Sequence, residues 1–273
     1  MKKSLKLFVI LSFNIFFINT NGYSQNMYII AGSGYNLSAG ADRLGTSSSS
    51  GKVKNVYGTF GEGLTFNAGI GGMFNEHIGC ELIFSVLSGR GIKYYDYSSY
   101  SEGFSSSHLI RAIPALKLTF GNKIKPYAKF GVLISVNNEI NFESSSTDNS
   151  FPGYTTTRAE KAHYSGGLST GVMGAFGFDF IISKKISIFS EINTINQTWG
   201  PGKVEYTSSV TVNGQYSSSS STEILVDEIA NGPSQSNERL KPILPFGSIG
   251  IQAGVKFIFG NNNSVSTIEK KSN

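Results

Sequence analysis

The sequence predicts an all-β protein: an eight-stranded antiparallel transmembrane β-barrel with short periplasmic turns and long extracellular loops. Three observations predict this fold. Many stretches alternate between apolar and small or polar residues, the chain begins with an export signal, and the connections between the alternating stretches are long and short in turn. Successive strand residues point to opposite faces, so this alternation gives a sheet with one apolar face.

The N-terminus has the pattern of a secretory signal. Three lysines among the first six residues precede an apolar run over 7–18, which has the length of a signal-peptide core and is too short for a transmembrane helix. Gly22 and Ser24 are the small residues expected before a cleavage site. The predicted organisation is a signal peptide at 1–24, an outer-membrane barrel at 25–260 and a flexible periplasmic tail at 261–273.

The composition favours a membrane-embedded sheet over a water-facing domain. Charged residues make up 15% of the chain, against roughly 25% in ordinary soluble domains, and 32 of the 273 residues are glycine. Three of the 23 basic residues fall in the signal, so the mature chain is nearly neutral and shows no electrostatic footprint for nucleic acid. The single cysteine, Cys80, excludes an intrachain disulfide.

The segment 249–259 shows the alternation most clearly. Ile251, Val255 and Phe257 share one face with other apolar residues, while Gln252 and Lys256 lie on the opposite face with two glycines. The apolar face is long enough for a membrane-crossing strand, which needs roughly 9–11 tilted residues. This segment is therefore predicted to span the bilayer.

The same period recurs upstream and defines eight strands. Their predicted ranges are 26–40, 58–73, 77–90, 107–120, 125–138, 164–181, 185–198 and 245–260. Two positions fit less well. Pro114 removes a hydrogen-bond donor from the middle of the fourth strand. Phe189 and Ser190 interrupt the parity of the seventh strand.

The connections between these strands alternate in length. The short ones lie near 75–76, 121–123 and 183–184, and the long ones span 41–57, 91–106, 139–163 and 199–244. Outer-membrane barrels have short turns on the periplasmic side and longer loops outside. A soluble sandwich or ligand-carrying barrel has no reason to sort its loops this way, so an exported soluble barrel is the disfavoured alternative.

Three segments carry a resemblance to a known family. Residues 114–121 lead into 125–131, residues 176–180 are followed by 187–192, and the closing strand is the third segment. In these segments the chain resembles the porin-like outer-membrane β-barrel family of Gram-negative bacteria, of the small eight-stranded type. Four residues of the closing strand resemble the signal read by the barrel assembly machinery, namely Gln252, Gly254, Phe257 and Phe259.

The resemblance implies a location and a set of partners. It places the protein in the outer membrane, in contact with membrane lipid and lipopolysaccharide. It also predicts handling by periplasmic chaperones and the barrel assembly machinery during biogenesis, and it implies no cofactor and no metal. The polar tail after the closing strand departs from the family pattern, in which the final aromatic residue often ends the chain.

The polar face of the predicted strands carries charged residues into a narrow interior. Eight strands enclose a lumen that side chains just fill. The charged residues expected there are Glu81, Arg111, Lys117, Lys129, Asp179, Glu191 and Lys256. Unpaired buried charges are costly, so we expect a structural network of ion pairs and hydrogen bonds. A conducting or proton-relay role is the alternative, since charges at membrane depth often serve function.

The long connections are rich in Ser, Tyr and Asn. Such residues either make an adaptable recognition surface or form hydrated, variable loops on a rigid scaffold. Asn213-Gly214 predicts a hairpin within the longest connection. Asp227, Glu228 and Glu238 are acidic residues near one another, but their spacing matches no known calcium loop.

Three classes of function remain open. The preferred hypothesis is a non-enzymatic scaffold that presents surface loops, for envelope integrity or surface interaction. The first alternative is a narrow channel for ions or small solutes, and the second is a lipid A-modifying barrel enzyme. His77, His108 and His163 stand in no catalytic or metal-binding motif, so no catalytic residue is predicted. The sequence identifies no surface ligand.

Overall fold

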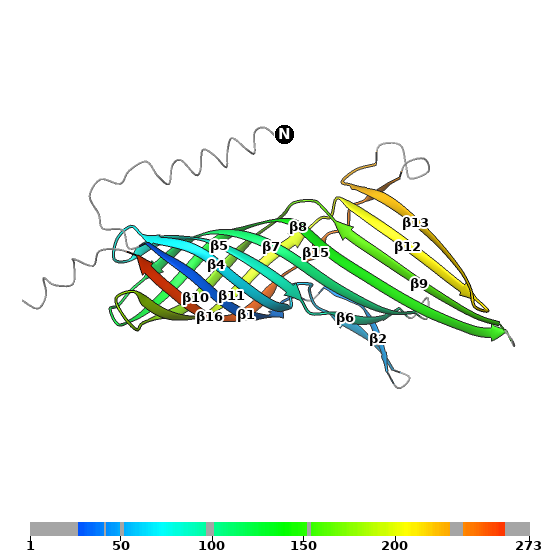
Figure 1. Cartoon of the computed structure of the whole chain (residues 1–273), viewed down its shortest axis with the longest axis horizontal. Helices are drawn as coiled ribbons and strands as arrows, with labels where there is room; N and C mark the ends of the chain where they lie inside the picture. The colour runs from blue at the N-terminus through cyan, green and yellow to red at the C-terminus, as the bar shows by residue number, and fades with distance from the viewer. Residues whose placement is uncertain are drawn as a thin grey trace, which may run out of the picture.

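A computed structural model describes residues 27–40, 42–49, 52–96, 101–151, 154–229 and 237–259. The predicted signal peptide and tail lie outside these residues. Within the described ranges, no helix has the length and apolar character needed to cross a membrane. The backbone there is almost entirely β-strand (Figure 1).

Eight strands form a closed antiparallel barrel (Figure 1). In chain order, which is also their order around the ring, they are β1 (Met27–Ser38), β4 (Gly63–Met73), β5 (Ile78–Gly89), β7 (Ser101–Thr119), β8 (Ile124–Phe151), β10 (Ser169–Ile181), β11 (Ile186–Trp199) and β16 (Ser248–Phe259). The ring closes where β16 pairs with β1 along the whole of both strands. The predicted eight-stranded antiparallel barrel is confirmed.

The two ends of the barrel differ in their connections. At one end, the turn end, short turns over 74–77, 120–123 and 182–185 join the strands. The first of these turns is held by the Asn75 side-chain carbonyl, which accepts hydrogen bonds from the His77 and Ile78 amides, each at 2.8 Å. All long connections leave from the opposite end, the loop end. The predicted alternation of short and long connections is therefore confirmed.

The long connections are largely β-strand and form an extension beyond the loop end (Figure 1). Apart from the outer parts of β7 and β8, the extension contains β2 (Arg43–Ser49), β3 (Lys52–Tyr57), β6 (Ile92–Asp96), β9 (Tyr154–Ser165), β12 (Lys203–Val212), β13 (Gln215–Val226) and β14 (Glu238–Leu240). A two-residue strand, β15 (Leu244–Pro245), pairs with β11 at the rim. The sequence reading takes these parts as loops, whereas much of their backbone is β-strand, because the ladders of β7 and β8 continue past the barrel.

The extension has two wings. On one side, β8 pairs with β9, which pairs with β12, then β13 and β14. On the other, β7 pairs with β6, which leads to β2 and β3. The predicted hairpin is confirmed: β12 and β13 are joined at Asn213 and Gly214, whose φ angles of 47° and 84° match a tight hairpin turn.

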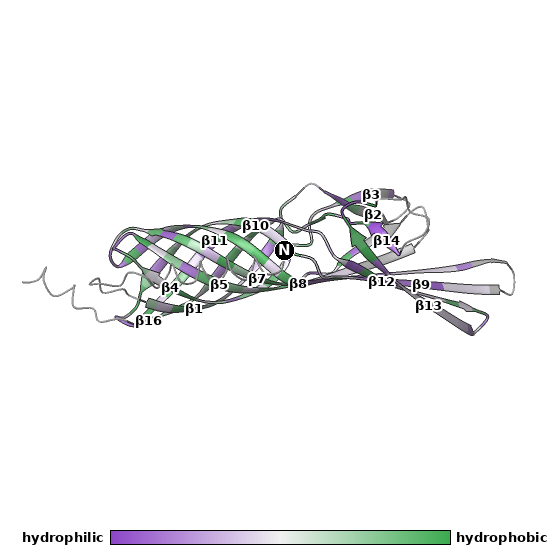
Figure 2. Ribbon diagram, turned by 90° about the horizontal axis from the view of Figure 1, so that it is seen from above, coloured by the Kyte–Doolittle hydropathy of each residue, from purple (hydrophilic) through white to green (hydrophobic). Residues whose placement is uncertain are grey.

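Side chains in β11 alternate between the lumen and the outside along its whole length. Phe189 is 2% exposed and points inward, whereas Ser190 points outward, so the apparent break in the sequence pattern is one apolar residue in the lumen and one small polar residue outside. Figure 2 shows hydrophobic residues recurring along the barrel strands, while the far parts of β9 and β13 are mostly pale or hydrophilic. The barrel therefore offers an apolar outer surface and the extension does not.

Pro114 is accommodated in β7 by a local gap in the ladder. It points outward and stays in register with Leu82 of β5. The register of β7 with β8 skips Ile113 and Pro114, so the missing donor interrupts pairing on one side only.

Four strand boundaries differ from the predicted ones by five residues or more. β4 begins at Gly63 instead of 58, and β7 begins at Ser101 instead of 107. The other two differ because of backbone geometry. β10 begins at Ser169 instead of 164, since Gly166 and Gly167 turn the chain with φ angles of 72° and 77°. β8 continues to Phe151 instead of ending at 138. A bulge at Asn137, with φ of 61°, lies where the β7–β8 register shifts. Odd-numbered residues of β8 face inward before the bulge and even-numbered ones just after it, so the bulge re-aims the strand as it leaves the barrel.

Candidate functional site

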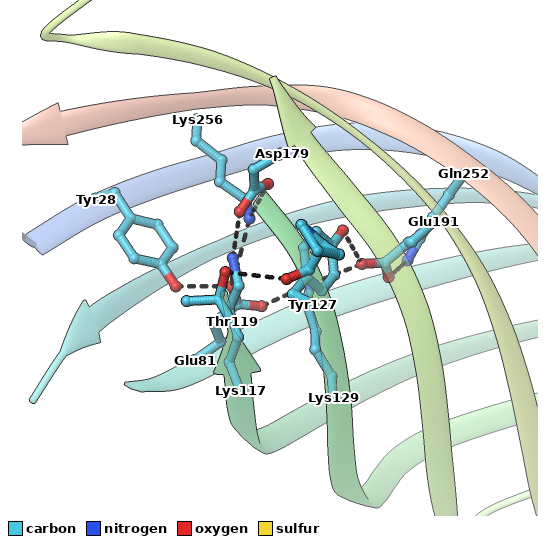
Figure 3. Close-up of polar contacts among 11 residues, drawn as sticks. Tyr28, Glu81, Lys117, Thr119, Tyr127, Lys129, Asp179, Glu191, Gln252 and Lys256 are labelled. Carbon is cyan, nitrogen blue, oxygen red and sulfur yellow. Dashed lines mark hydrogen bonds and ion pairs between the residues drawn. The ribbon is translucent and has the colours of Figure 1, made fainter. Parts of the chain in front are cut away.

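Six charged side chains meet in the lumen near the turn end and form an ionic cluster (Figure 3). Each comes from a different strand: Glu81 (β5), Lys117 (β7), Lys129 (β8), Asp179 (β10), Glu191 (β11) and Lys256 (β16). None is more than 6% exposed. The alternation of each strand turns these residues inward, away from the apolar outer face.

Lysines and carboxylates interleave within this cluster. The Nζ–oxygen distances are 2.8 Å for Lys129–Glu81, 2.7 Å for Lys129–Glu191, 2.5 Å for Lys117–Asp179, 2.6 Å for Lys256–Asp179, and 3.7 Å from both Lys117 and Lys256 to Glu81. Three cations thus face three anions. Balanced pairing is what makes burial tolerable, since a single unpaired ion would carry a large desolvation cost.

Aromatic side chains complete the coordination of the cluster (Figure 3). The Tyr28 hydroxyl donates to Glu81 at 2.8 Å and the Tyr127 hydroxyl donates to Glu191 at 2.6 Å. The Gln252 amide also donates to Glu191. Lys117 Nζ lies 4.2 Å from the centre of the Tyr127 ring, within the range of a cation–π contact. The cluster is thereby packed and hydrogen-bonded, which suits a structural role.

A polar layer follows on the loop-end side of the ionic cluster. The Asn67 amide donates to the Gln252 side-chain carbonyl. Asn36, Asn67 and Asn193, together with Met173 and other side chains, line a cavity of about 20 Å³. Such a volume holds roughly one water-sized group, so this part of the lumen is narrow.

Arg111 lies apart from the ionic cluster. It is 0% exposed, and its Nε donates to the Gln197 side-chain carbonyl at 2.8 Å. The Gln197 amide in turn donates to the Ser169 hydroxyl at 2.9 Å, which fixes the orientation of the amide. The structure therefore joins six of the seven charged residues expected in the lumen and leaves Arg111 in a separate layer.

An apolar cap closes the lumen at the loop end. Its buried members are Phe60, Leu87, Leu109, Ile140, Trp199 and Phe246, each at most 7% exposed. Phe60 and Phe246 come from segments just before β4 and β16, and their ring centres lie 5.9 Å apart. Trp199, at the end of β11, anchors the cap by donating from Nε1 to the Gly166 carbonyl at 2.8 Å. The lumen is thus filled by ions at one end and by apolar side chains at the other.

Sequence reasoning missed this cap. The available signal was the lone tryptophan, since Trp199 continues the inward parity of β11 just past the predicted strand end at 198. Phe60 and Phe246 fell inside the predicted strands 58–73 and 245–260, where they read as ordinary strand residues. Their rings turn into the lumen because of packing against residues far away in the sequence, which the alternation of neighbouring residues does not reveal.

The histidines occupy three separate places. His77 is in a turn, with Nδ1 3.2 Å from the Thr119 carbonyl, and His108 is exposed on β7. His163 Nδ1 lies 2.6 Å from the Asn141 side-chain oxygen. Across the described part of the chain, no group of three or more His, Cys, Asp or Glu side chains is placed to hold a metal ion. Asp227, one of the acidic residues considered for a cation, pairs with Lys241 at 3.0 Å.

The four residues of the predicted assembly signal divide between the two faces of β16. Gln252 points into the lumen, and Phe257 and Phe259 point outward. Gly254 sits against β1, where a Cβ would lie 2.2 Å from the Ala31 carbonyl oxygen. The glycine is thus needed for the close approach of the first and last strands, whatever its part in assembly.

These features define the class of protein. The strands form a closed antiparallel ring with short turns at one end and long connections at the other. Large apolar side chains cover the outside of the ring, among them Phe84, Phe130, Phe176, Ile192 and Ile251, each at least 52% exposed. Charged residues face inward. The chain is a transmembrane β-barrel of the outer-membrane type.

Solved structures with a similar arrangement are outer-membrane barrels. A major outer membrane protein from Thermus thermophilus matches with a TM-score of 0.41 and 11% identity, over 87% of this chain and 100% of that one. OprG from Pseudomonas aeruginosa matches with a TM-score of 0.38 and 12% identity, over 89% and 100%. The outer membrane protein AlkL matches with a TM-score of 0.34 and 14% identity, over 90% and 96%. No protein-family model and no curated sequence matches the chain.

Proposed function

We propose that this protein is a non-enzymatic anchor in the outer membrane whose closed barrel holds the extension at the cell surface, where the extension makes the functional contacts. The observation that carries the proposal is the filled lumen. Because the ionic cluster occupies the turn end and the apolar cap occupies the loop end of the described residues, we infer that the barrel offers no open path. A barrel filled in this way serves as a support.

The shape and chemistry of the extension support the second half of the proposal. β8 carries the chain 28 residues without a break, from the turn end far into the extension. The residues of β13 from Gln215 to Glu223 pair with β12 and present serines and Tyr216 to solvent. Tyrosine and serine together make adaptable polar contacts, and an ordered sheet presents them with less loss of entropy than a loop.

The same proposal assigns the orientation and biogenesis of the barrel. The turn end faces the periplasm and the extension faces outward, following the geometry of outer-membrane barrels. Membrane lipid contacts the apolar outer face, and lipopolysaccharide contacts the rim at the loop end. Gln252, Gly254, Phe257 and Phe259 would present the closing strand to the barrel assembly machinery after delivery by periplasmic chaperones.

Conductance across planar bilayers tests the closed lumen. We expect no stable current steps from the wild-type protein, and steps from a Phe60→Ser, Phe246→Ser double variant in which the cap is opened. Boiled and unboiled gel mobility would show that both proteins are folded. Stable steps from the folded wild type would overturn the closed-lumen proposal and establish the narrow-channel alternative.

Labelling of intact cells tests the orientation. In a Cys80→Ala background, Ser219→Cys places a thiol on exposed β13 and Lys184→Cys places one at a turn. A membrane-impermeant maleimide should label Ser219→Cys on whole cells and reach Lys184→Cys only after the outer membrane is broken. The reverse pattern would invert the proposed orientation and remove the extension from the surface.

A further inference from the structure

One edge of β13 pairs with no other strand of the described residues over most of its length. The opposite edge pairs with β12 from Gln215 to Ile224, without a shift in register. On the edge away from β12, which we call the open edge, β14 pairs only with residues 224–226. The side chains of residues 215–222 are all exposed. The extension therefore ends, on this side, in a long exposed strand.

The hydrogen bonds at the end of β13 show which backbone groups point to the open edge. The Ile224 amide donates to the Asn237 carbonyl at 2.7 Å, on the β14 side, whereas the Leu225 amide donates to the Gly202 carbonyl at 2.9 Å, on the β12 side. Backbone groups of successive strand residues point to opposite sides, so the even-numbered residues face away from β12. Four residues between the hairpin turn and β14 thus direct their N–H and C=O groups to the open edge, namely Tyr216, Ser218, Ser220 and Thr222.

The open edge of β13 lacks the features that keep exposed edges from pairing. Charged side chains, prolines and bulges are the usual protections of an edge strand. Residues 215–222 of β13 contain no charge and no proline, and their ladder with β12 has no bulge. β3, at the other end of the sheet, carries Lys52 and Lys54, which are both exposed. Charge therefore protects the edge of β3, while the open edge of β13 is suited to the addition of a strand.

The open edge is complementary to itself. A second β13 that runs antiparallel, centred on Ser219, matches every outward-facing residue of one copy with an outward-facing residue of the other. Each copy then offers four N–H and four C=O groups, so the two strands form eight hydrogen bonds. No like charges meet, because Glu223, the one charged residue of 215–223, lies opposite the Gln215 amide. The opposed residues of the two copies are Gln215–Glu223, Tyr216–Thr222, Ser217–Ser221, Ser218–Ser220 and Ser219–Ser219.

We propose that the open edge of β13 binds the same edge of a second copy of this protein, and that the second copy is anchored in a facing outer membrane. β13 runs between the base of the extension and its far tip (Figure 1). Copies in one membrane share this direction relative to the membrane, whereas an antiparallel pair needs opposite directions. A copy in a facing membrane meets that condition, and the contact is then two-fold symmetric and joins two cells. The inference rests on the proposed function, in which the extension faces outward.

Cysteine cross-linking between two sets of vesicles tests the register and the facing membranes together. In a Cys80→Ala background, Ser217→Cys is reconstituted into one set of phosphatidylcholine vesicles and Ser221→Cys into another. These positions form a non-hydrogen-bonded pair in the proposed register, whose Cα atoms would lie about 4.5 Å apart, within the range for a disulfide. Mixing the two sets with copper phenanthroline should give a disulfide-linked dimer. Ser217→Cys in both sets should give little dimer, because the two thiols are then out of register.

Two results would overturn the proposal. One is the absence of dimer from the mixed vesicles, or equal amounts from the matched and the out-of-register positions. The other is a dimer that forms only when both variants share one vesicle. If Ser219→Cys is labelled on whole cells while the vesicles do not cross-link, the pairing fails and the surface position of the extension stands. If the label does not reach Ser219→Cys from outside, the proposed function fails as well.

Proline on the open edge gives an independent test. In a Ser218→Pro, Ser220→Pro double variant, the lost N–H groups face away from β12, so the hairpin keeps its ladder. Light scattering should show that vesicles carrying the wild type cluster and that those carrying this variant do not. A Ser217→Ala, Ser219→Ala double variant keeps every backbone group and should cluster like the wild type. Boiled and unboiled gel mobility shows that each protein is folded. Equal clustering of the wild type and the proline variant, or none with the wild type, would contradict pairing at this edge.

Discussion

The barrel and the extension share two long strands, β7 and β8, but stabilise charge in opposite ways. β8 contributes Lys129 to the lumen, where its side chain is 1% exposed and paired with Glu81 at 2.8 Å. Further along, β8 contributes Glu143 to the extension, where it pairs with Lys161 at 2.9 Å and is 52% exposed. The geometry of the two ion pairs is nearly the same. The surroundings decide how much each contributes to stability.

This difference shows that the distance between two charged groups does not determine how much the ion pair contributes to the stability of the protein. In the lumen, removing one partner leaves an ion in a poorly solvated space. In the extension, water solvates whichever ion remains, and salt screens the pair. The barrel therefore depends on its charged residues, while the extension tolerates changes to them.

Removing Glu81 should have the largest effect. In Glu81→Ala, the lysines of the ionic cluster outnumber its carboxylates and the Tyr28 hydroxyl loses its acceptor. We expect the free energy of unfolding to fall by about 3–5 kcal/mol, measured by urea unfolding in micelles, with little change in conductance. A Glu81→Ala, Lys129→Met double variant should recover part of the loss. A loss below about 1 kcal/mol, the range of an exposed pair, or a large conductance with unchanged stability, would contradict a structural role.

Trp199→Ala should come next, since it removes the largest side chain of the apolar cap. The residue is 0% exposed and its Nε1 donates to Gly166. Truncation of a buried tryptophan costs about 3–4 kcal/mol through lost burial and the cavity left behind. Thermal unfolding would measure it, and Tyr216→Ala, on exposed β13, is the matched aromatic control with no expected change. Equal effects at the two positions would mean that the cap is not packed.

Gly167→Ala and Gly214→Ala compare the rim with the extension at equal backbone geometry. Their φ angles are 77° and 84°, so each alanine meets the left-handed strain of about 1–2 kcal/mol. At Gly167 a Cβ would also lie 2.2 Å from the Gly200 carbonyl oxygen, whereas at Gly214 nothing lies within 4 Å. Gly167→Ala should therefore lower the Tm more. A larger effect at Gly214 would show that the extension, not the rim, limits stability.

Glu143→Gln should have the smallest effect. The pair with Lys161 is exposed on both sides, and such pairs contribute about 0–1 kcal/mol. Urea unfolding at low and high salt would measure it, with the variant and the wild type becoming indistinguishable at high salt. A loss comparable to that of Glu81→Ala would remove the distinction between the two regions.

The barrel could be predicted from the sequence because every second residue of its strands faces lipid and most of these residues are apolar. Residues such as Ile188 and Ile192 must face hydrocarbon, which forces Glu191 between them into the lumen. The inward position of the charged residues follows from the same rule. Each barrel strand was found for this reason, including β11, where the misfit of Phe189 reflects an apolar residue in a mostly polar interior.

The strands of the extension and the side-chain contacts inside the lumen could not be predicted in this way. Ser217 and Ser218 on β13 are both exposed. Because water contacts both faces of this strand, its residues do not alternate between apolar and polar types. The bulge at Asn137 shifts the parity of β8 through a single backbone angle that residue type does not specify. The isolation of Arg111 depends on which side chains meet across the ring, through its contact with Gln197 86 positions away.

The pairing of β1 with β16 links charge balance to the completion of folding. Tyr28 on the first strand and Lys256 on the last both reach the ionic cluster. Lys256 on β16 lies 3.7 Å from Glu81 on β5, three strands away across the seam, so the ring must close for these two side chains to meet. The step that removes the last exposed edges of the sheet therefore also completes the ionic cluster. A partly closed sheet lacks both, which favours an all-or-none finish to assembly.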